Sequence, residues 1–270
     1  WIATQNGGRV YRTTDGGATW VDSVVDGLIV PNTVKFKDLQ TGFVTNNNNG
    51  NVYKSTDGGV TWAPIAATTV RQNSFDLNGT NIWTAGNTGT MTKSSNDGTN
   101  YTELHSAVTI QQIRRIHFFN SQFGVAAGGS TSTTLNIGEV SKTTNGGATW
   151  EVLPFNFGRI VYAFAAPTEN IWYAATGLNK IFKTTDAGAT WVEQTSALPG
   201  TTALWSMAFL NETTGFIGGV SGSLMRTTDG GATWTQITNS GFPGTQTIFD
   251  MAYQPDGSIT IVGGGSNAIK

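Results

Sequence analysis

An eight-residue pattern that recurs along the chain limits what this sequence can fold into more than any other feature. The octet Thr-Thr-Asp-Gly-Gly-Ala-Thr-Trp begins at Thr13. Variants of it, which we also call octets, begin at Ser55, Ser94, Thr143, Thr184 and Thr227. Successive octets start 42, 39, 49, 41 and 43 residues apart. A period of this length in a chain with 35 Gly and only 12% charged residues predicts repeated units of four short β-strands.

The residues between octets fit a four-strand unit. Before the octet at Ser55, the ranges 33–36, 42–45 and 52–55 are apolar or β-branched segments separated by turn residues. We interpret them as strands a, b and c, and we expect strand d to begin at Trp62. Each octet then forms the turn between strands c and d.

The two ends of the chain decide the expected number of units. Trp1 aligns with Trp83 and Trp172, so the first unit begins at strand b, whereas residues 247–270 supply strands a, b and c. We therefore predict an all-β chain forming a single seven-bladed β-propeller, incomplete at both ends and part of a larger chain or assembly, with six blades as the alternative. The expected blades are 1–26, 31–66, 70–106, 112–155, 159–194, 203–238 and 247–270.

Composition excludes several functions. The 15 Lys plus Arg nearly balance the 17 Asp plus Glu, so no broad basic surface is expected for nucleic acid. The absence of Cys removes disulfides and thiolate ligands, and no apolar run is long enough to span a bilayer. His105 and His117 lack further ligands at metal spacing, so neither a metal nor a cofactor is expected. The spacing of Asp76 and Glu103 gives no reason to join them to His117.

The octet itself is expected to be structural. Its third residue can accept hydrogen bonds from the backbone of a tight turn, and its Trp can pack against the sheet. One carboxylate per blade is too widely spaced for a catalytic pair, and the Asn at position 145 cannot act as a general base. The ligand spacing of a calcium loop is also absent. The predicted structural residues are Asp15, Asp57, Asn96, Asn145, Asp186 and Asp229, with Trp20, Trp62, Trp150, Trp191 and Trp234.

Candidate binding residues fall at the other end of the blades, where strand a begins. Arginines cluster there in three consecutive units, aromatic residues and an Asp stand at the equivalent places of later units, and the longest repeat carries an inserted b–c loop at 130–138. Guanidinium groups bind carboxylates through paired hydrogen bonds, so the arginines favour an anionic partner. The candidates are Arg71, Arg114, Arg115, Arg159, Trp205, Phe249 and Asp250.

The octets resemble the Asp-box, or BNR repeat, with the pattern Ser/Thr-x-Asp-x-Gly-x-Thr-Trp. The resemblance covers nearly all of the chain and implies a β-propeller. The sequence around the octets is similar to that of non-catalytic photosystem II assembly-factor-like propellers and of secreted propellers of Bacteroidota-type bacteria. In the first group an arginine patch meets partner proteins, which implies such a role for Arg71, Arg114 and Arg159.

Sialidases, which also carry this repeat, are a more distant resemblance. Arg71, Arg114 and Arg159 can be compared with their arginine triad and Tyr162 with their nucleophile, but the Arg-Ile-Pro motif and a Glu beside Tyr162 are missing. Xyloglucan-cleaving relatives need two tandem propellers. We therefore expect a non-catalytic binding or scaffold protein of the bacterial cell envelope or exterior, with a protein or glycan partner. A sialidase-like glycoside hydrolase is the alternative.

Overall fold

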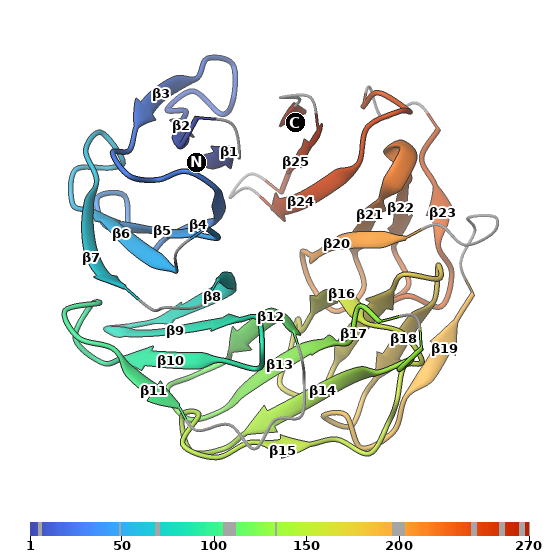
Figure 1. Ribbon diagram of the computed structural model, residues 1–270. Coiled ribbons are helices and arrows are strands. Elements are labelled where there is room, and N and C mark those ends of the chain that lie inside the picture. The colour runs from blue at the N-terminus through green and yellow to red at the C-terminus, as the bar shows by residue number, and fades with distance from the viewer. Residues whose placement is uncertain are drawn as a thin grey trace. The chain divides into compact units, whose positions relative to one another are not determined.

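The structure is almost entirely β-sheet. The computed structural model describes residues 1–4, 7–48, 50–67, 71–104, 112–132, 134–195, 203–238, 242–253, 257–264 and 268–269. In this part of the chain the only helical element is a short 3-10 turn, η1 (Val220–Gly222), and no helix has the length and hydropathy needed to cross a membrane. The remaining elements are strands (Figure 1), which confirms the prediction of an all-β chain.

The described strands form seven antiparallel sheets in which neighbours along the chain are also neighbours in the sheet. The three-stranded sheets are β1 (Ile2–Thr4), β2 (Arg9–Arg12), β3 (Val21–Val24), and β24 (Ile248–Tyr253), β25 (Ile259–Gly263), β26 (Ala268–Ile269). The four-stranded sheets are β4 (Pro31–Phe36), β5 (Gly42–Asn46), β6 (Asn51–Ser55), β7 (Ala63–Ala67); β8 (Gln72–Asn78), β9 (Asn81–Gly86), β10 (Met91–Ser94), β11 (Thr102–Leu104); β12 (Gln112–Phe118), β13 (Gly124–Gly129), β14 (Gly138–Thr143), β15 (Glu151–Val152); β16 (Val161–Ala165), β17 (Trp172–Thr176), β18 (Ile181–Thr184), β19 (Val192–Gln194); and β20 (Leu204–Phe209), β21 (Gly215–Gly219), β22 (Leu224–Thr227), β23 (Thr235–Gln236).

This strand pattern agrees with the four-stranded blades expected from the sequence. The predicted strands at 33–36, 42–45 and 52–55 correspond to β4, β5 and β6, and each octet lies at the turn between strands c and d. The first sheet contains the equivalents of strands b, c and d, and the last contains those of a, b and c. Seven separate sheets support the seven-bladed prediction over the six-bladed alternative.

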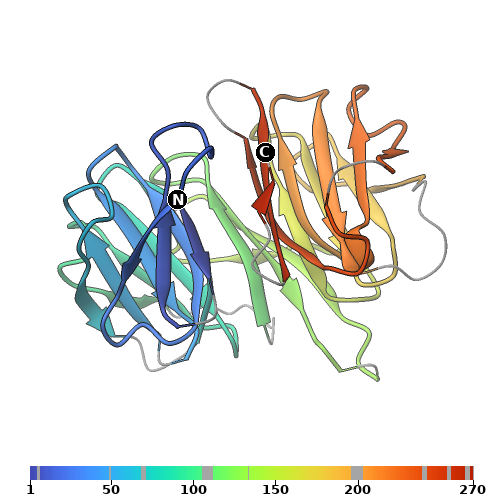
Figure 2. The ribbon, with the colours of Figure 1, turned by 90° about the horizontal axis from the view of Figure 1, so that it is seen from above.

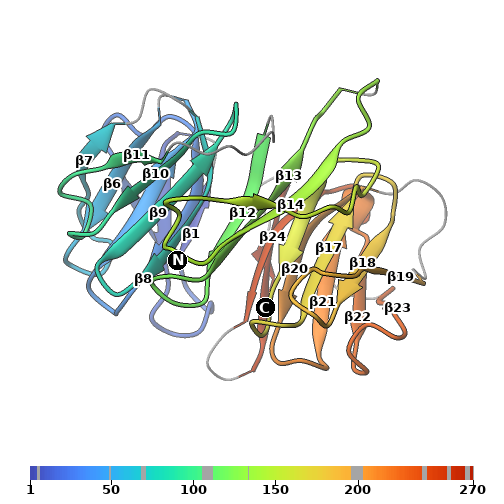
Figure 3. The ribbon, with the colours of Figure 1, turned by 90° about the horizontal axis from the view of Figure 1, so that it is seen from below.

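The chain divides into two compact units, which we describe separately. Unit 1 contains Trp1–Ala126 and Ser141–Val152, and unit 2 contains Ala127–Val140 and Leu153–Lys270. In unit 1 the sheets of β4–β7 and β8–β11 lie side by side (Figure 3). In unit 2 the sheets of β16–β19, β20–β23 and β24–β26, coloured yellow to red, lie in succession (Figure 2).

The core of each unit lies between successive sheets. In unit 1, Trp83 and Met91 of one sheet pack with Ile113 and Ile116 of the next. In unit 2, Tyr173 packs in the same way with the following sheet. Second strands such as β5 and β17 are buried along their whole length, whereas last strands such as β3 and β19 are mostly exposed. Sheets covered on both faces explain why the second strands read as continuous apolar or small-residue runs.

Candidate functional site

Each octet forms a turn closed by its own side chains and backbone. Between β6 and β7, Ser55 Oγ donates to Asp57 Oδ1 at 2.8 Å and accepts from Gly59 N at 2.8 Å. Asp57 accepts from Thr61 N at 2.9 Å and from the Thr61 hydroxyl at 2.5 Å. The Thr61 hydroxyl, followed by its backbone N–H, lowers the pKa of Asp57 to about 2 because both donors stabilise the charged form. The carboxylate is occupied by its own turn.

The other octets repeat this arrangement around Asp15, Asp186, Asp229, Asn145 and Asn96. Asn145 shows how the amide replaces the carboxylate: its Oδ1 accepts from Thr149 N at 2.9 Å, and its Nδ2 donates to the Thr149 hydroxyl at 2.8 Å. The turn therefore needs a side-chain acceptor at this position and does not need its negative charge.

The octet tryptophans pack onto the sheets. Trp20 and Trp62 donate their indole N–H groups to Gly17 O and Gly59 O at 3.1 and 3.2 Å. The tryptophans of three later octets are buried, namely Trp150, Trp191 and Trp234. These positions suit the packing role expected for the octet Trp.

A three-ring stack joins an octet to the sheet before it, a feature that the sequence analysis missed. Trp83 of β9 stacks on Phe118 of β12 at 3.7 Å, and Phe118 meets the octet Trp150 edge-on at 6.0 Å. The Trp83 indole N–H also donates to Gly146 O in that octet at 2.9 Å. The same arrangement occurs in Trp1, Phe36 and Trp62 of unit 1 and in Tyr173, Phe209 and Trp234 of unit 2. The octets are therefore contacts between sheets as well as turns.

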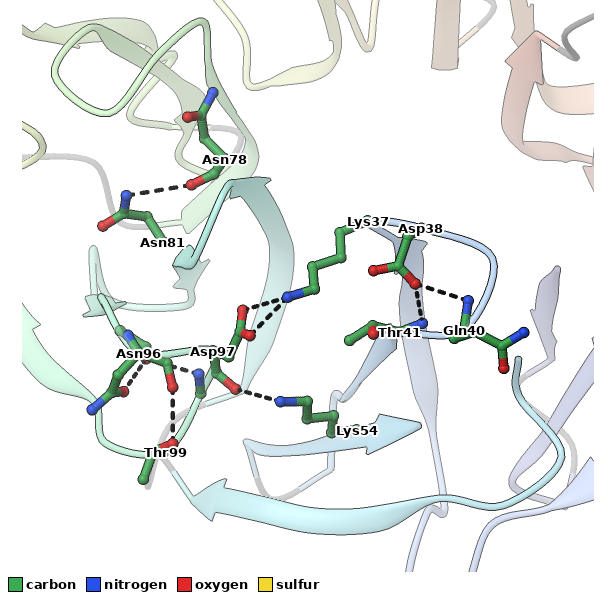
Figure 4. Close-up of polar contacts among 12 residues, drawn as sticks. Lys37, Asp38, Gln40, Thr41, Lys54, Asn78, Asn81, Asn96, Asp97 and Thr99 are labelled. Carbon is green, nitrogen blue, oxygen red and sulfur yellow. Dashed lines mark hydrogen bonds and ion pairs between the residues drawn. The ribbon is translucent and has the colours of Figure 1, made fainter. Parts of the chain in front are cut away.

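Lysines add to these contacts between sheets. Figure 4 shows Lys37, which follows β4, paired at 2.7 Å with the carboxylate of Asp97, in the octet of the following sheet. Lys54 of β6 donates to Asp97 O at 3.3 Å (Figure 4). In unit 2, Lys183 donates at 2.6 Å to Gly230 O, in the octet of the following sheet. This end of the sheets is thus extensively used for packing.

The first strands of unit 1 contain a charged cluster of Lys35, Asp76 and His117, which the sequence did not predict. Asp76 of β8 is buried, and its carboxylate lies 2.6 Å from Lys35 Nζ and 3.1 Å from His117 Nδ1. It also accepts from Phe118 N at 2.6 Å. Burial alone raises the pKa of Asp76, but the charge of Lys35 and the bond from His117 outweigh burial and hold the pKa well below its usual range.

The sequence gives no reason in the spacing to join Asp76 to His117, but the structure brings the two side chains into contact. The two residues stand one repeat apart, on first strands that pack against each other. This one-repeat spacing is the feature of the sequence from which their contact could have been predicted. Glu103 takes no part in the cluster, because it lies exposed on β11, the last strand of its sheet. His105 lies outside the described residues.

The arginines do not occupy equivalent positions. Arg71 directly precedes β8, Arg159 lies two residues before β16, and Arg114 and Arg115 lie inside β12 rather than at its entry. Arg71 is exposed, whereas the other three are partly buried. Arg71, Arg114 and Arg115 belong to unit 1, and Arg159 belongs to unit 2. The arginines that the sequence groups at the start of strand a therefore do not share one register position on the first strands.

An aromatic row does follow the register, on the first strands of unit 2. Tyr162 of β16 stacks on Trp205 of β20 with 4.5 Å between ring centroids, and Phe249 of β24 meets Trp205 edge-on at 6.1 Å. We call Tyr162, Trp205 and Phe249 the aromatic row. Trp205 and Phe249 are predicted site residues that the structure brings together, whereas the resemblance to sialidases implies only a nucleophile role for Tyr162.

β-Bulges place the aromatic row. The pairing of first and second strands shifts by one residue between Val161 and Ala163, between Leu204 and Ser206, and between Ile248 and Asp250. Each shift falls at the aromatic residue in between. A bulge re-aims the side chain of the extra residue, and bulges are frequent beside binding sites. Counting back from Phe118, which packs over Gly124 as Phe209 packs over Gly215, places Arg114 at the corresponding position of β12.

The last member of the aromatic row is the most open to solvent. Phe249 is 50% exposed, while Tyr162 and Trp205 are partly buried. Asp250, the next residue, is exposed, and Ser206 Oγ donates to its Oδ1 at 3.3 Å. The row lies at the end of the sheets that carries the b–c turns, since Tyr162 borders Gly177 and Phe249 borders Gly264. The octets occupy the other end of each sheet.

Metal-binding geometry is not seen in the part of the chain that the structure describes, where no three His, Asp or Glu side chains group around one point. What this end of unit 2 offers is a partly open aromatic surface with a carboxylate at its edge. Such a surface can hold apolar and cationic groups.

No protein-family model matches the chain. A search of curated proteins also finds no match.

Solved structures, in contrast, resemble the chain in fold. YCF48 bound to a D1 peptide has 20% sequence identity and a TM-score of 0.76, over 97% of this chain and 85% of that one. YCF48 from Cyanidioschyzon merolae has 16% identity and a TM-score of 0.77, over 99% and 92%. A GH74 xyloglucanase from Xanthomonas campestris has 14% identity and a TM-score of 0.76, over 98% of this chain and 49% of that one. These similarities, together with the antiparallel sheets, show that the fold is a multi-bladed β-propeller.

Proposed function

We propose that this chain is a non-catalytic binding propeller with a protein partner, which it holds against the aromatic row of unit 2. The observation that carries the proposal is that three consecutive first strands each present an aromatic ring at a β-bulge. Packed aromatic side chains supply large contact area at low entropic cost, and they are enriched at the centres of protein interfaces. The half-exposed ring of Phe249 gives a partner an apolar surface to cover.

The division of labour between the two ends of the sheets supports the same proposal. The octet carboxylates are engaged by their own turns, and octet glycines such as Gly146 and Gly230 accept hydrogen bonds from the preceding sheet. A partner that docked there would compete with contacts that hold the fold. The b–c end carries the bulges and the open aromatic surface instead.

The comparison with YCF48 is consistent with a protein partner, because one of its structures holds a D1 peptide. Within the proposal, Arg71, Arg114, Arg115 and Arg159 are further contacts for acidic parts of the partner. The low content of charged residues and the many Asn, Thr and Gly residues favour an extracellular or cell-envelope setting in a bacterium.

A glycoside hydrolase is the alternative, and the GH74 comparison is the observation that favours it. Hydrolysis of a glycoside requires two carboxyl groups, or a Tyr with a Glu partner, around one bond. In the structure, Tyr162 stacks on the Trp205 ring, an arrangement that serves packing. Turnover of a fluorogenic sialoside or of xyloglucan, lost in Tyr162→Phe, would establish the alternative and overturn the non-catalytic proposal.

The direct test is capture of partner proteins from an envelope extract by the wild-type chain, Phe249→Ser and Val192→Ser. Val192 is the matched control, because it is a 63% exposed apolar residue on β19, away from the aromatic row. We expect Phe249→Ser to lose the proteins that the wild type retains and Val192→Ser to keep them. An identical set of captured proteins in all three cases would refute the proposal.

A further inference from the structure

We propose that the aromatic row takes a lysine or arginine side chain of the partner, held between the ring of Phe249 and the carboxylate of Asp250. This inference rests on the proposed function and names the chemistry of the partner. It assigns the open end of the aromatic row, at Phe249 and Asp250, the opposite charge preference from the one that the arginines favour.

The bulge in β24 makes both residues available on the same strand. In a regular strand, successive side chains point to opposite faces, so one of two neighbours is covered by the adjoining sheet. The register shift between Ile248 and Asp250 interrupts that alternation. Ile248 is buried, whereas Phe249 and Asp250 are both exposed. An aromatic ring and a carboxylate therefore reach solvent next to each other.

Within the aromatic row, Phe249 is the ring that is most exposed to solvent. Trp205 is stacked on one side by Tyr162 and met edge-on by Phe249. Phe249 stands at the end of the row and is half exposed. A cation over an aromatic face within about 6 Å of the ring centroid is attracted by the ring quadrupole.

Asp250 supplies the charge that selects a cation. Ser206 donates to its Oδ1 at 3.3 Å, which orients the carboxylate beside the row. A carboxylate has about four lone-pair sites, so this bond leaves room for an ammonium or guanidinium group. Among the ion pairs between described residues, none involves Asp250. Lys180, another cation of unit 2, is paired with Glu193 at 2.8 Å.

Ring and carboxylate together fit a long basic side chain. The methylene stem of Lys or Arg can lie along the aromatic row while its charged end meets Asp250. An acidic side chain at the same place would face both the carboxylate and the negative ring face. An apolar side chain would gain only the contact with the row.

The test is fluorescence anisotropy with three labelled hexapeptides, Ala-Leu-Xaa-Leu-Ala-Ser, in which Xaa is arginine, norleucine or glutamate. We expect the arginine peptide to bind about fivefold more tightly than the norleucine peptide, and the glutamate peptide to bind most weakly. Asp250→Asn should reduce the preference for arginine, because only the attraction of the Phe249 ring remains, and should leave the norleucine affinity unchanged. Glu103→Gln, a matched loss of an exposed carboxylate on β11, should leave all three affinities as they are.

Two results overturn the inference: equal affinities for the arginine and norleucine peptides, and a preference for arginine that is as large in Asp250→Asn as in the wild type. The inference is also overturned if none of the three peptides binds. Phe249→Ala separates these results from failure of the proposed function. If the arginine preference fails but Phe249→Ala weakens peptide binding or partner capture, the row binds a partner of other chemistry. If Phe249→Ala changes neither peptide binding nor partner capture, the proposed function fails as well.

Discussion

Replacing Asp76 with Asn tests whether the cluster of Asp76, Lys35 and His117 fastens the first strands of unit 1 together. The buried carboxylate accepts from Lys35 Nζ, His117 Nδ1 and Phe118 N, so its bonds join β8 to β4 on one side and to β12 on the other. Asn removes the charge. The NH2 group of Asn is itself a donor, so it cannot accept a hydrogen bond from the one of these three donors that it faces.

The expected cost follows from burial. Breaking a buried charge pair typically costs about 3–5 kcal/mol. Lys35 and His117 side chains are each 39% exposed and can regain water in the variant, so we expect a loss near the lower end, about 3 kcal/mol. For a chain of this size that corresponds to a fall in melting temperature of roughly 6–12 °C. Asp97→Asn, which breaks the pair of Lys37 with a carboxylate that is more exposed than that of Asp76, should cost less than about 1 kcal/mol.

The assay is thermal unfolding of wild type, Asp76→Asn and Asp97→Asn, followed by circular dichroism over a range of pH. Because the pKa of Asp76 is lowered in the folded state, its contribution to stability is present above the unfolded pKa near 4 and is lost as pH falls below it. The difference between wild type and Asp76→Asn should therefore shrink in acid. Equal stability at neutral pH, or a difference that persists in strong acid, would refute the reasoning.

Three further predictions concern the octets and the stacks. Asp57→Asn should keep most of the stability that Asp57→Ala loses, because an amide serves the same turn elsewhere in the chain; urea midpoints compare the two. Trp83→Phe should cost about 1 kcal/mol, from the lost bond to Gly146 O, and Trp83→Ala about 3–5 kcal/mol, by denaturant titration. Since hydrogen bonds lower the pKa of Asp57, Asp186 and Asp229 to about 2, the stability that they add above pH 4 should disappear between about pH 4 and 2 in an acid titration. Comparable losses in Asp57→Asn and Asp57→Ala, full stability of Trp83→Ala, or an acid-insensitive fold would each contradict these expectations.

Local chemistry made the repeat and its strands predictable. An octet specifies its turn through residues two and four positions apart, so one copy can be read without knowledge of the rest of the fold. The strand boundaries followed because turns at each octet and at Gly-rich positions leave only short segments between them. The separation of the first and last sheets followed from aligning Trp1 with Trp83.

The site was harder to predict because it depends on register. Three bulges shift the first strands of unit 2, and a position counted from the octet does not reveal where the extra residue falls. The arginines were therefore grouped although only Arg114 corresponds to the aromatic row. The period held a clue that went unused: Lys35, Asp76 and His117 recur at one-repeat intervals, and so do Tyr162, Trp205 and Phe249.

The central claim is that the octets hold the fold while the aromatic row binds the partner. The measurement that tests it most directly pairs partner capture with melting temperature for Phe249→Ala and Asp57→Ala. The account predicts that Phe249→Ala loses the partner at unchanged melting temperature, whereas Asp57→Ala lowers the melting temperature and retains the partner in the folded protein. Loss of the partner by a fully stable Asp57→Ala, together with normal capture by Phe249→Ala, would contradict it.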